Sequence, residues 1–167
     1  MHSAVKSIND ITIRTELKPG DIGYVTYLHG KLYSEEYQYG IEFETYVSTG
    51  LVEFFNQYNP KRNRVWVCED ADTIVGFLLL LDRGDAAQLR YFILMPEYRG
   101  LGLGNKLMKL YVGFLKSAGY KSSYLWTTHE LTSAAQLYKK FGFTLTEEKE
   151  SHAFGKPLVE QRYDLHW

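Results

Sequence analysis

The feature that most constrains this chain is a run of alternating glycines, Gly100, Gly102 and Gly104, between a predicted strand (87–94) and a predicted helix. Glycine weakens regular structure by roughly 0.5–1 kcal/mol relative to alanine, so three within five residues indicate a backbone that a ligand approaches closely. The first turn of a helix has unpaired N–H groups and the positive end of the helix dipole. The segment therefore predicts a pyrophosphate cradle of main-chain amides, with the charge of Arg99 at its mouth.

Two nucleotide-binding signatures do not fit this segment. A dinucleotide fingerprint needs a glycine at its sixth position, where the chain has Asn105 or Leu107, depending on the starting glycine. A P-loop also needs a glycine where Asn105 stands. The remaining alternative is a glycine-rich junction that binds nothing, which would weaken the chain without improving its packing. A ligand with a pyrophosphate explains the pattern better.

Composition fits one globular domain, which we expect to cover 1–167 with a polar segment at 1–10. The net charge of −1 gives no reason to expect nucleic acid or an anionic membrane as a partner. The longest apolar run, 75–81, is far shorter than the roughly 20 residues of a membrane helix. The first ten residues are polar and do not form a signal peptide, so we expect a cytoplasmic protein.

The cysteine and histidine patterns give no reason to expect a metal. The single cysteine, Cys68, follows an apolar run and is expected to be buried. The five histidines are scattered, without the spacing of zinc ligands. Aromatic residues reach 16%, which predicts either a thick aromatic core or a cleft lined by some of the rings.

Periodicity predicts a mixed α/β chain. We expect strands at 11–15, 64–69, 73–81, 87–94 and 122–128, a strand that starts at 143, and a last strand at 161–167 that closes the sheet. Helices are expected from about residue 22, over 43–58, after the glycines, and from 133 to 141. Asp21 is the expected N-cap of the first helix, and Ser133 with Gln136 resembles a capping box.

These segments resemble the GNAT superfamily of acetyl-CoA-dependent N-acetyltransferases. Residues 99–104 resemble its Q/R-x-x-G-x-G/A signature, and 89–98 resemble the strand and exit that precede it. Residues 135–143 are similar to the A-x-x-L-Y-x-x-x-G-F block of the family. More narrowly, 28–33, 125–127 and 154–159 look like the GNAT module found behind MarR-type regulators and its stand-alone relatives.

The resemblance implies a single-domain GNAT-like α/β fold, with a mixed central sheet that splays between its fourth and fifth strands and with flanking helices. It implies that acetyl-CoA is the co-substrate and that no metal takes part. The pantetheine arm would pair with the strand backbone near Phe92, Ile93 and Leu94. The pyrophosphate would lie on the backbone of the signature, which comprises Arg99, Gly100, Leu101, Gly102, Leu103, Gly104 and Asn105.

The implied reaction is direct attack of an amine on the thioester. The Leu94 amide is the candidate donor to the oxyanion. Tyr138 stands where the family places the tyrosine that contacts or protonates the leaving thiolate; its alternative role is core packing on a helix. The acceptor would be a small-molecule or peptide amine, in a groove lined by His29, Tyr33, Trp126 and Phe154. The aromatic supply would also suit a homodimer, whose interface the sequence does not show.

Two departures from the family pattern bear on catalysis. Gln88 stands where some members carry a glutamate base, and Leu131 replaces an asparagine that contacts the cofactor arm. Another side chain could then act as the base through a water molecule, or the amine could already be neutral when it binds. The candidate bases are Glu42, Glu44, His29 and Glu130, each with a structural alternative such as a half-buried histidine. The departures also leave open a non-catalytic acyl-CoA-binding or sensory module.

Overall fold

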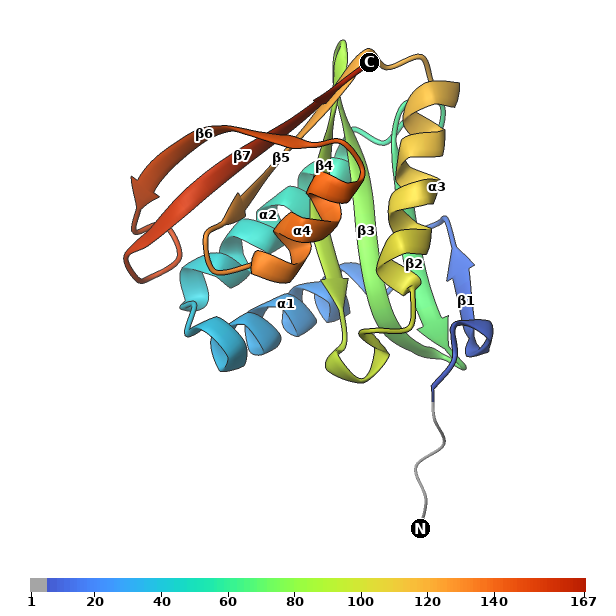
Figure 1. The fold of residues 1–167 in the computed structure, drawn as a ribbon. Helices are drawn as coiled ribbons and strands as arrows, with labels where there is room; N and C mark the ends of the chain where they lie inside the picture. Colours follow the sequence, from blue (N-terminus) through green and yellow to red (C-terminus); the bar gives the residue numbers. More distant parts are fainter. Residues whose placement is uncertain (1–5) are drawn as a thin grey trace.

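A computed structural model describes residues 6–167 as one mixed sheet with helices on both faces (Figure 1). The strands are β1 (Ile11–Arg14), β2 (Arg64–Asp70), β3 (Thr73–Arg83), β4 (Ala86–Leu94), β5 (Ser122–Thr128), β6 (Thr144–Ser151) and β7 (Leu158–His166). The helices are α1 (Asp21–Tyr37), α2 (Ile41–Asn56), α3 (Leu103–Ser117) and α4 (Thr132–Lys140), with short 3₁₀ turns at Ile8–Asp10 and Pro96–Tyr98. Positions 1–5 of the polar segment predicted at 1–10 lie outside the described residues.

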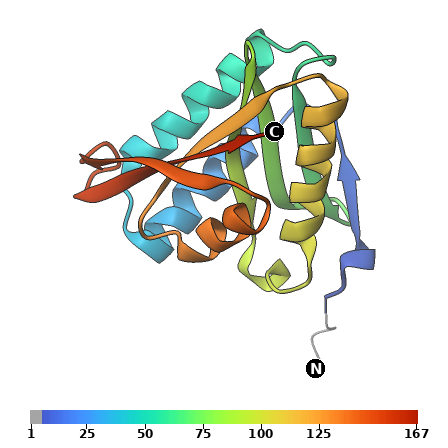
Figure 2. The same ribbon diagram turned by 45° about the horizontal axis from the view of Figure 1, so that its top comes forward.

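The sheet divides the core into two parts (Figure 2). Helices α3 and α4 pack on one face, and α1 and α2 pack on the other. The strand order is β1-β2-β3-β4-β5-β7-β6, with β4 and β5 parallel and the other neighbours antiparallel. The predicted α/β class and the hairpin of β2 and β3 are confirmed. Cys68 is buried in this core, as expected.

The last strand does not close the sheet as predicted. β7 lies between β5 and β6, and β6 forms the edge. β6 is almost wholly exposed and carries alternating acidic, basic and hydroxyl residues, which suits an edge strand that must not pair with another chain. β7 carries buried Leu158 and Tyr163 and therefore takes the inner place.

A bulge in β4 separates it from β5 at one end of the sheet. The β3–β4 register shifts between the pair Leu79–Arg90 and the pair Phe77–Ile93, and Tyr91 takes a left-handed conformation at φ +59°. Such an irregularity bends a strand and increases its local twist. β4 pairs with β5 only over Ala86–Gln88, so the expected splay between the two strands is confirmed.

The residue at the bulge is held by helix α2. A side chain at Gly50 would overlap the hydroxyl of Tyr91, so the ring of Tyr91 packs directly on the helix backbone. Glycine inside a helix costs roughly 1 kcal/mol relative to alanine. The close approach of Tyr91 explains why α2 has a glycine at position 50 despite this cost.

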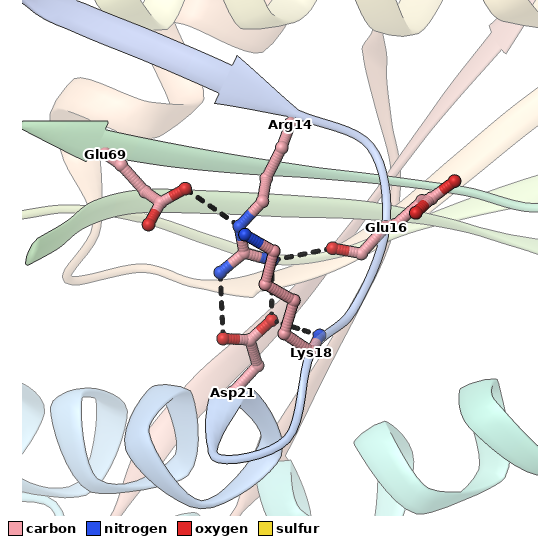
Figure 3. Close-up of polar contacts among 5 residues, drawn as sticks. All are labelled: Arg14, Glu16, Lys18, Asp21 and Glu69. Atoms are coloured by element: carbon pink, nitrogen blue, oxygen red, sulfur yellow. Dashed lines mark hydrogen bonds and ion pairs between the residues drawn. The ribbon is translucent and has the colours of Figure 1, made fainter. Parts of the chain in front are cut away.

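Both predicted N-caps are wrong. Helix α1 follows Gly20, and the carboxylate of Asp21 instead accepts hydrogen bonds from the Arg14 guanidinium and the Lys18 N–H (Figure 3). Arg14 also reaches Glu69 on β2, so this cluster ties the start of α1 to two strands. Helix α4 has Leu131 at its N-cap position and no side-chain cap, because it starts one residue before Ser133.

Candidate active site

The glycine-rich turn forms the predicted cradle at the start of α3. Gly100 and Gly102 are left-handed, at φ +77° and φ +87°, and Gly102 is the residue before the helix. A Cβ at either position would meet no other atom, so the backbone faces open space. The amides of the first helical turn have no intrahelical partner and point toward this space. The turn therefore has the geometry of an anion site.

A hollow of about 450 Å³ lies between this turn, the end of β4 and helix α4. Most residues predicted for the cofactor line it, namely Phe92, Ile93, Leu94, Arg99, Gly100, Gly102, Gly104, Asn105 and Tyr138. Leu101 and Leu103 do not line it. The side chain of Leu103 is buried in the core under α3, so at most its backbone could face a ligand. We call this hollow the cradle.

The outer edge of β4 presents backbone groups to the cradle that have no neighbouring strand. Met95 N–H donates to the Val75 carbonyl of β3 at 2.8 Å. Because successive residues of a strand face opposite neighbours, Phe92 and Leu94 turn their backbone groups away from β3 toward the splay. Two side chains donate hydrogen bonds to this edge. The Tyr33 hydroxyl donates to the Phe92 carbonyl over a long 3.5 Å, and Arg99 Nε donates to the Leu94 carbonyl.

The positive charge at the mouth of the cradle is already paired. Arg99 forms a two-pronged ion pair with Glu36 at the end of α1, at 2.6 and 3.0 Å. This carboxylate raises the pKa of Arg99. An anionic ligand would therefore compete with Glu36 for the guanidinium. On the other side of the turn, Lys140 Nζ donates to Asn105 Oδ1 at 2.9 Å and brings a second cation near the cradle.

A second, smaller hollow of about 80 Å³ lies on the α1–α2 side of the splay, and we call it the aromatic pocket. All four residues predicted for the acceptor groove, His29, Tyr33, Trp126 and Phe154, line it. Sequence reasoning missed four further aromatic rings and a carboxylate there: Tyr39, Phe43, Tyr46, Tyr91 and Glu160. Of these, only Tyr39 had a signal in the sequence, the density of tyrosines between residues 24 and 39.

The two hollows meet at four residues. Tyr33, Phe92, Leu131 and Tyr138 line both the cradle and the aromatic pocket. Tyr138 is 5% exposed, and its ring lies edge-on to Phe92 at 6.3 Å between centroids. Burial raises the pKa of Tyr138 above the usual tyrosine range, so its hydroxyl keeps its proton at neutral pH. A molecule in each hollow would come together beside a neutral phenol.

His29 forms part of the wall of the aromatic pocket and is 1% exposed. Its Nδ1 lies 2.8 Å from the Val25 carbonyl, which can only accept, so Nδ1 carries the proton. Its Nε2 is buried and makes no hydrogen bond with any described residue. Burial lowers the pKa of His29 to about 4, although the hydrogen bond to the Val25 carbonyl raises it. The imidazole is therefore neutral at physiological pH.

The depressed pKa of His29 predicts acid sensitivity. Between about pH 6.5 and pH 4 the unfolded chain binds a proton that the folded chain does not, so stability falls as the pH falls. We expect the free energy of unfolding to drop by roughly 2 kcal/mol from pH 7.5 to pH 5 through this group. Urea denaturation of the wild type and of His29→Gln at both pH values measures this drop in the free energy of unfolding. An equal drop in both proteins would contradict the assignment, since glutamine does not titrate.

The carboxylates suggested as bases lie elsewhere. Glu130 pairs with Lys156 at 2.9 Å, Glu44 packs against Gly30 on α1, and Glu42 lies outside the aromatic pocket. Gln88 does line the pocket, where its Oε1 accepts from Arg83 at 3.0 Å. Among the four candidates only His29 reaches the pocket.

The described part of the chain shows neither a metal cluster nor a membrane span. Within residues 6–167, no three His, Cys, Asp or Glu side chains gather closely enough to hold a metal ion. The helices in the same range are too short or too polar to cross a bilayer.

Comparison with known proteins supports the resemblance. The sequence profile of the Acetyltransferase (GNAT) family matches residues 29–143. An uncharacterized N-acetyltransferase of Schizosaccharomyces pombe is 30% identical over 118 residues, which span 69% of this chain and 72% of that protein. The range matched by the family profile contains β4, the glycine turn, α3 and α4, and therefore the residues of the cradle.

Solved structures have the same fold. An acetyltransferase from Streptococcus agalactiae superposes with a TM-score of 0.76 at 19% identity, over 96% of this chain and all of that one. The acetyltransferase yncA from Salmonella typhimurium was solved with acetyl-CoA. It superposes with a TM-score of 0.71 at 16% identity, over 95% of this chain and 94% of that one. At such identities these likenesses concern the fold alone.

Proposed function

Because the chain belongs to the acetyltransferase (GNAT) family, we propose that it transfers the acetyl group of acetyl-CoA to a primary amine of a small molecule or peptide. The amine would attack directly within a ternary complex. One observation carries this proposal: the cradle and the aromatic pocket adjoin each other and share Tyr33, Phe92, Leu131 and Tyr138. Two substrates held in these hollows would meet there, as direct transfer requires.

The features of the cradle suit acetyl-CoA. The open left-handed glycines and the amides of α3 would hold the pyrophosphate. The strand edge at Phe92 and Leu94, which has no neighbouring strand, would pair with the amides of the pantetheine arm. When bound, acetyl-CoA supplies an activated acyl group on a thiolate leaving group. The Leu94 N–H is the candidate donor to the oxyanion, because the strand alternation turns it toward the splay.

Two side chains are proposed to handle protons. Tyr138 would donate its hydroxyl proton to the departing thiolate, since its raised pKa keeps it neutral. His29 would accept a hydrogen bond or a proton from the amine at Nε2, directly or through water, since its other nitrogen already donates to Val25. Its low pKa keeps that lone pair available at neutral pH.

Several narrower statements belong to the same proposal. We propose that residues 1–167 form one acetyltransferase domain that works without a metal. The narrower resemblance to the module found behind MarR-type regulators, the cytoplasmic location and the homodimer stay predictions.

Thermal denaturation with acetyl-CoA, CoA and NAD⁺, followed by thiol release on a panel of primary amines, tests the proposal. Acetyl-CoA at a hundredfold excess over its Kd should stabilise the protein by about 2.7 kcal/mol, and NAD⁺ should not. Amine-dependent release of free thiol then identifies an enzyme. Stabilisation without release on any amine would favour the non-catalytic acyl-CoA-binding module, and no stabilisation would contradict both.

A further inference from the structure

A buried arginine in the aromatic pocket has no part in the reaction described so far. Arg90 lies on β4 two residues before Phe92, its side chain is 10% exposed, and it lines the pocket. Its Nε is buried and makes no hydrogen bond with any residue that the structure describes. A guanidinium always carries its charge and offers five N–H donors. A buried donor without an acceptor is costly, unless a ligand supplies that acceptor.

The charge of Arg90 is only partly compensated by the protein. Its ion pair with Glu53 on α2 is loose, at 3.8 Å from Nη1 to Oε2. The other oxygen of Glu53 accepts from Arg83 at 2.7 Å. One carboxylate thus serves two guanidinium groups, and two positive charges with one negative charge leave a net charge of +1.

The immediate surroundings hold the guanidinium without neutralising it. Its Cζ lies 5.0 Å from the ring centroid of Tyr46 and 4.6 Å from that of Tyr91. The ring faces attract the cation and fix its plane, but they cannot accept its N–H bonds as a carboxylate does. Glu42 lines a neighbouring hollow with Arg90, yet its carboxylate lies against Gly40 and Gly155.

A different strand brings the opposite charge to the same pocket. Glu160 on β7 stands opposite Thr128 of β5 and also lines the aromatic pocket. Its carboxylate forms no ion pair with the residues described. The pocket therefore combines aromatic walls with one underused guanidinium and one unpaired carboxylate, which is complementary to a molecule that carries both an ammonium and a carboxylate.

We propose that the acceptor is an amine that also carries a carboxylate, such as an amino acid or a short peptide, and that Arg90 binds this carboxylate. The proposal rests on the function proposed above. Arg90 and the junction residue Phe92 are two residues apart across the bulge of β4, so their Cα atoms lie at most roughly 7 Å apart. That spacing suits a short zwitterion. A polyamine has only positive charges and would face the guanidinium with a like charge.

The test compares acceptor amines with and without a carboxylate. Alanine, leucine and phenylalanine are each compared with their carboxamides and with the amines that lack the carboxyl group, using kcat/KM from thiol release. The wild type should prefer at least one acid over its two analogues by roughly ten- to hundredfold, the usual effect of a charge-assisted hydrogen bond. Arg90→Gln should lose this preference, and Arg90→Lys should keep part of it.

Arg64→Gln is the matched control, because the buried Nε of Arg64 on β2 also makes no hydrogen bond with a described residue and its guanidinium lies over a ring, that of Phe114 at 4.6 Å, but Arg64 does not line the pocket. It should keep the preference for acids. Thermal denaturation with acetyl-CoA checks that each variant folds and binds the co-substrate. The inference is overturned if the wild type uses the amides and decarboxylated amines as well as the acids, or if Arg90→Gln keeps the preference. Failure of the proposed function is distinct: no amine of any class would release the thiol.

Discussion

Replacing Tyr138 with phenylalanine is expected to lower kcat by roughly a hundred- to ten-thousandfold, the usual contribution of a positioned proton donor. The substitution removes one hydroxyl and keeps the ring that packs against Phe92 and Phe143. Acetyl-CoA binding should therefore change little, because the cradle is formed chiefly by backbone groups of the glycine turn and β4. The steady-state rate of thiol release gives kcat, and isothermal titration calorimetry gives the Kd of acetyl-CoA.

Tyr163→Phe is the matched control for this experiment. Tyr163 is 2% exposed, its ring lies 6.3 Å from that of Tyr138, and it lines neither the cradle nor the aromatic pocket. The same chemical change at this neighbouring ring should leave kcat within about threefold of the wild type, because no proton donor is lost. Equal kcat values for Tyr138→Phe and Tyr163→Phe would show that Tyr138 has a packing role alone.

Placing a carboxylate in the cradle with Gly102→Glu is expected to weaken acetyl-CoA binding by about a hundredfold or more. The new charge would lie where the helix amides are proposed to hold the pyrophosphate, so it would both occupy the amides and repel the phosphates. A Cβ at this position meets no other atom within 4 Å, so attaching the side chain causes no clash at its base. Calorimetric titration with acetyl-CoA measures the change.

Gly102→Gln separates charge from backbone strain. Both substitutions force a side chain into the left-handed conformation of Gly102, at a cost of roughly 1–2 kcal/mol. The glutamate lies at the N-terminus of α3, where a negative charge is favourable by about 0.3–1 kcal/mol, so Gly102→Glu should unfold at the higher urea concentration. It should nevertheless bind acetyl-CoA more weakly. Equal affinities in the two variants would contradict an anion site at this turn.

Local patterns located the cradle correctly. Alternating glycines between a strand and an amphipathic helix predict a backbone that a ligand can approach closely, and the structure has an open turn there with Gly100 and Gly102 left-handed. The strand predicted at 122–128 is β5 with the same bounds. These features depend on neighbours within a few residues of sequence, and backbone preference and side-chain periodicity report such neighbours directly.

Contacts between distant segments were not predictable in the same way. The N-cap assigned to Asp21 failed because Arg14 and Lys18 compete for its carboxylate, which becomes clear only when β1 and α1 come together. The charge of Arg99 was expected at the mouth of the cradle, but nothing in the sequence indicated that Glu36, far away in sequence, pairs with it. In both cases an ion pair between two different elements of the fold decided what the charged side chain contacts.

The sequence by itself determined the fold class, the position of the glycine-rich turn and the family, because glycine conformation, apolar periodicity and motif spacing are local properties. The tertiary structure alone decided the shape and charge of the aromatic pocket. The bulge at Tyr91 fits against Gly50 on a helix some forty positions earlier, and it sets Arg90 and Tyr91 beside the rings of α1 and α2. Glu160 reaches the same pocket because β7 inserts between β5 and β6. Strand order and register bring these residues together, and neither is written in any short segment of the chain.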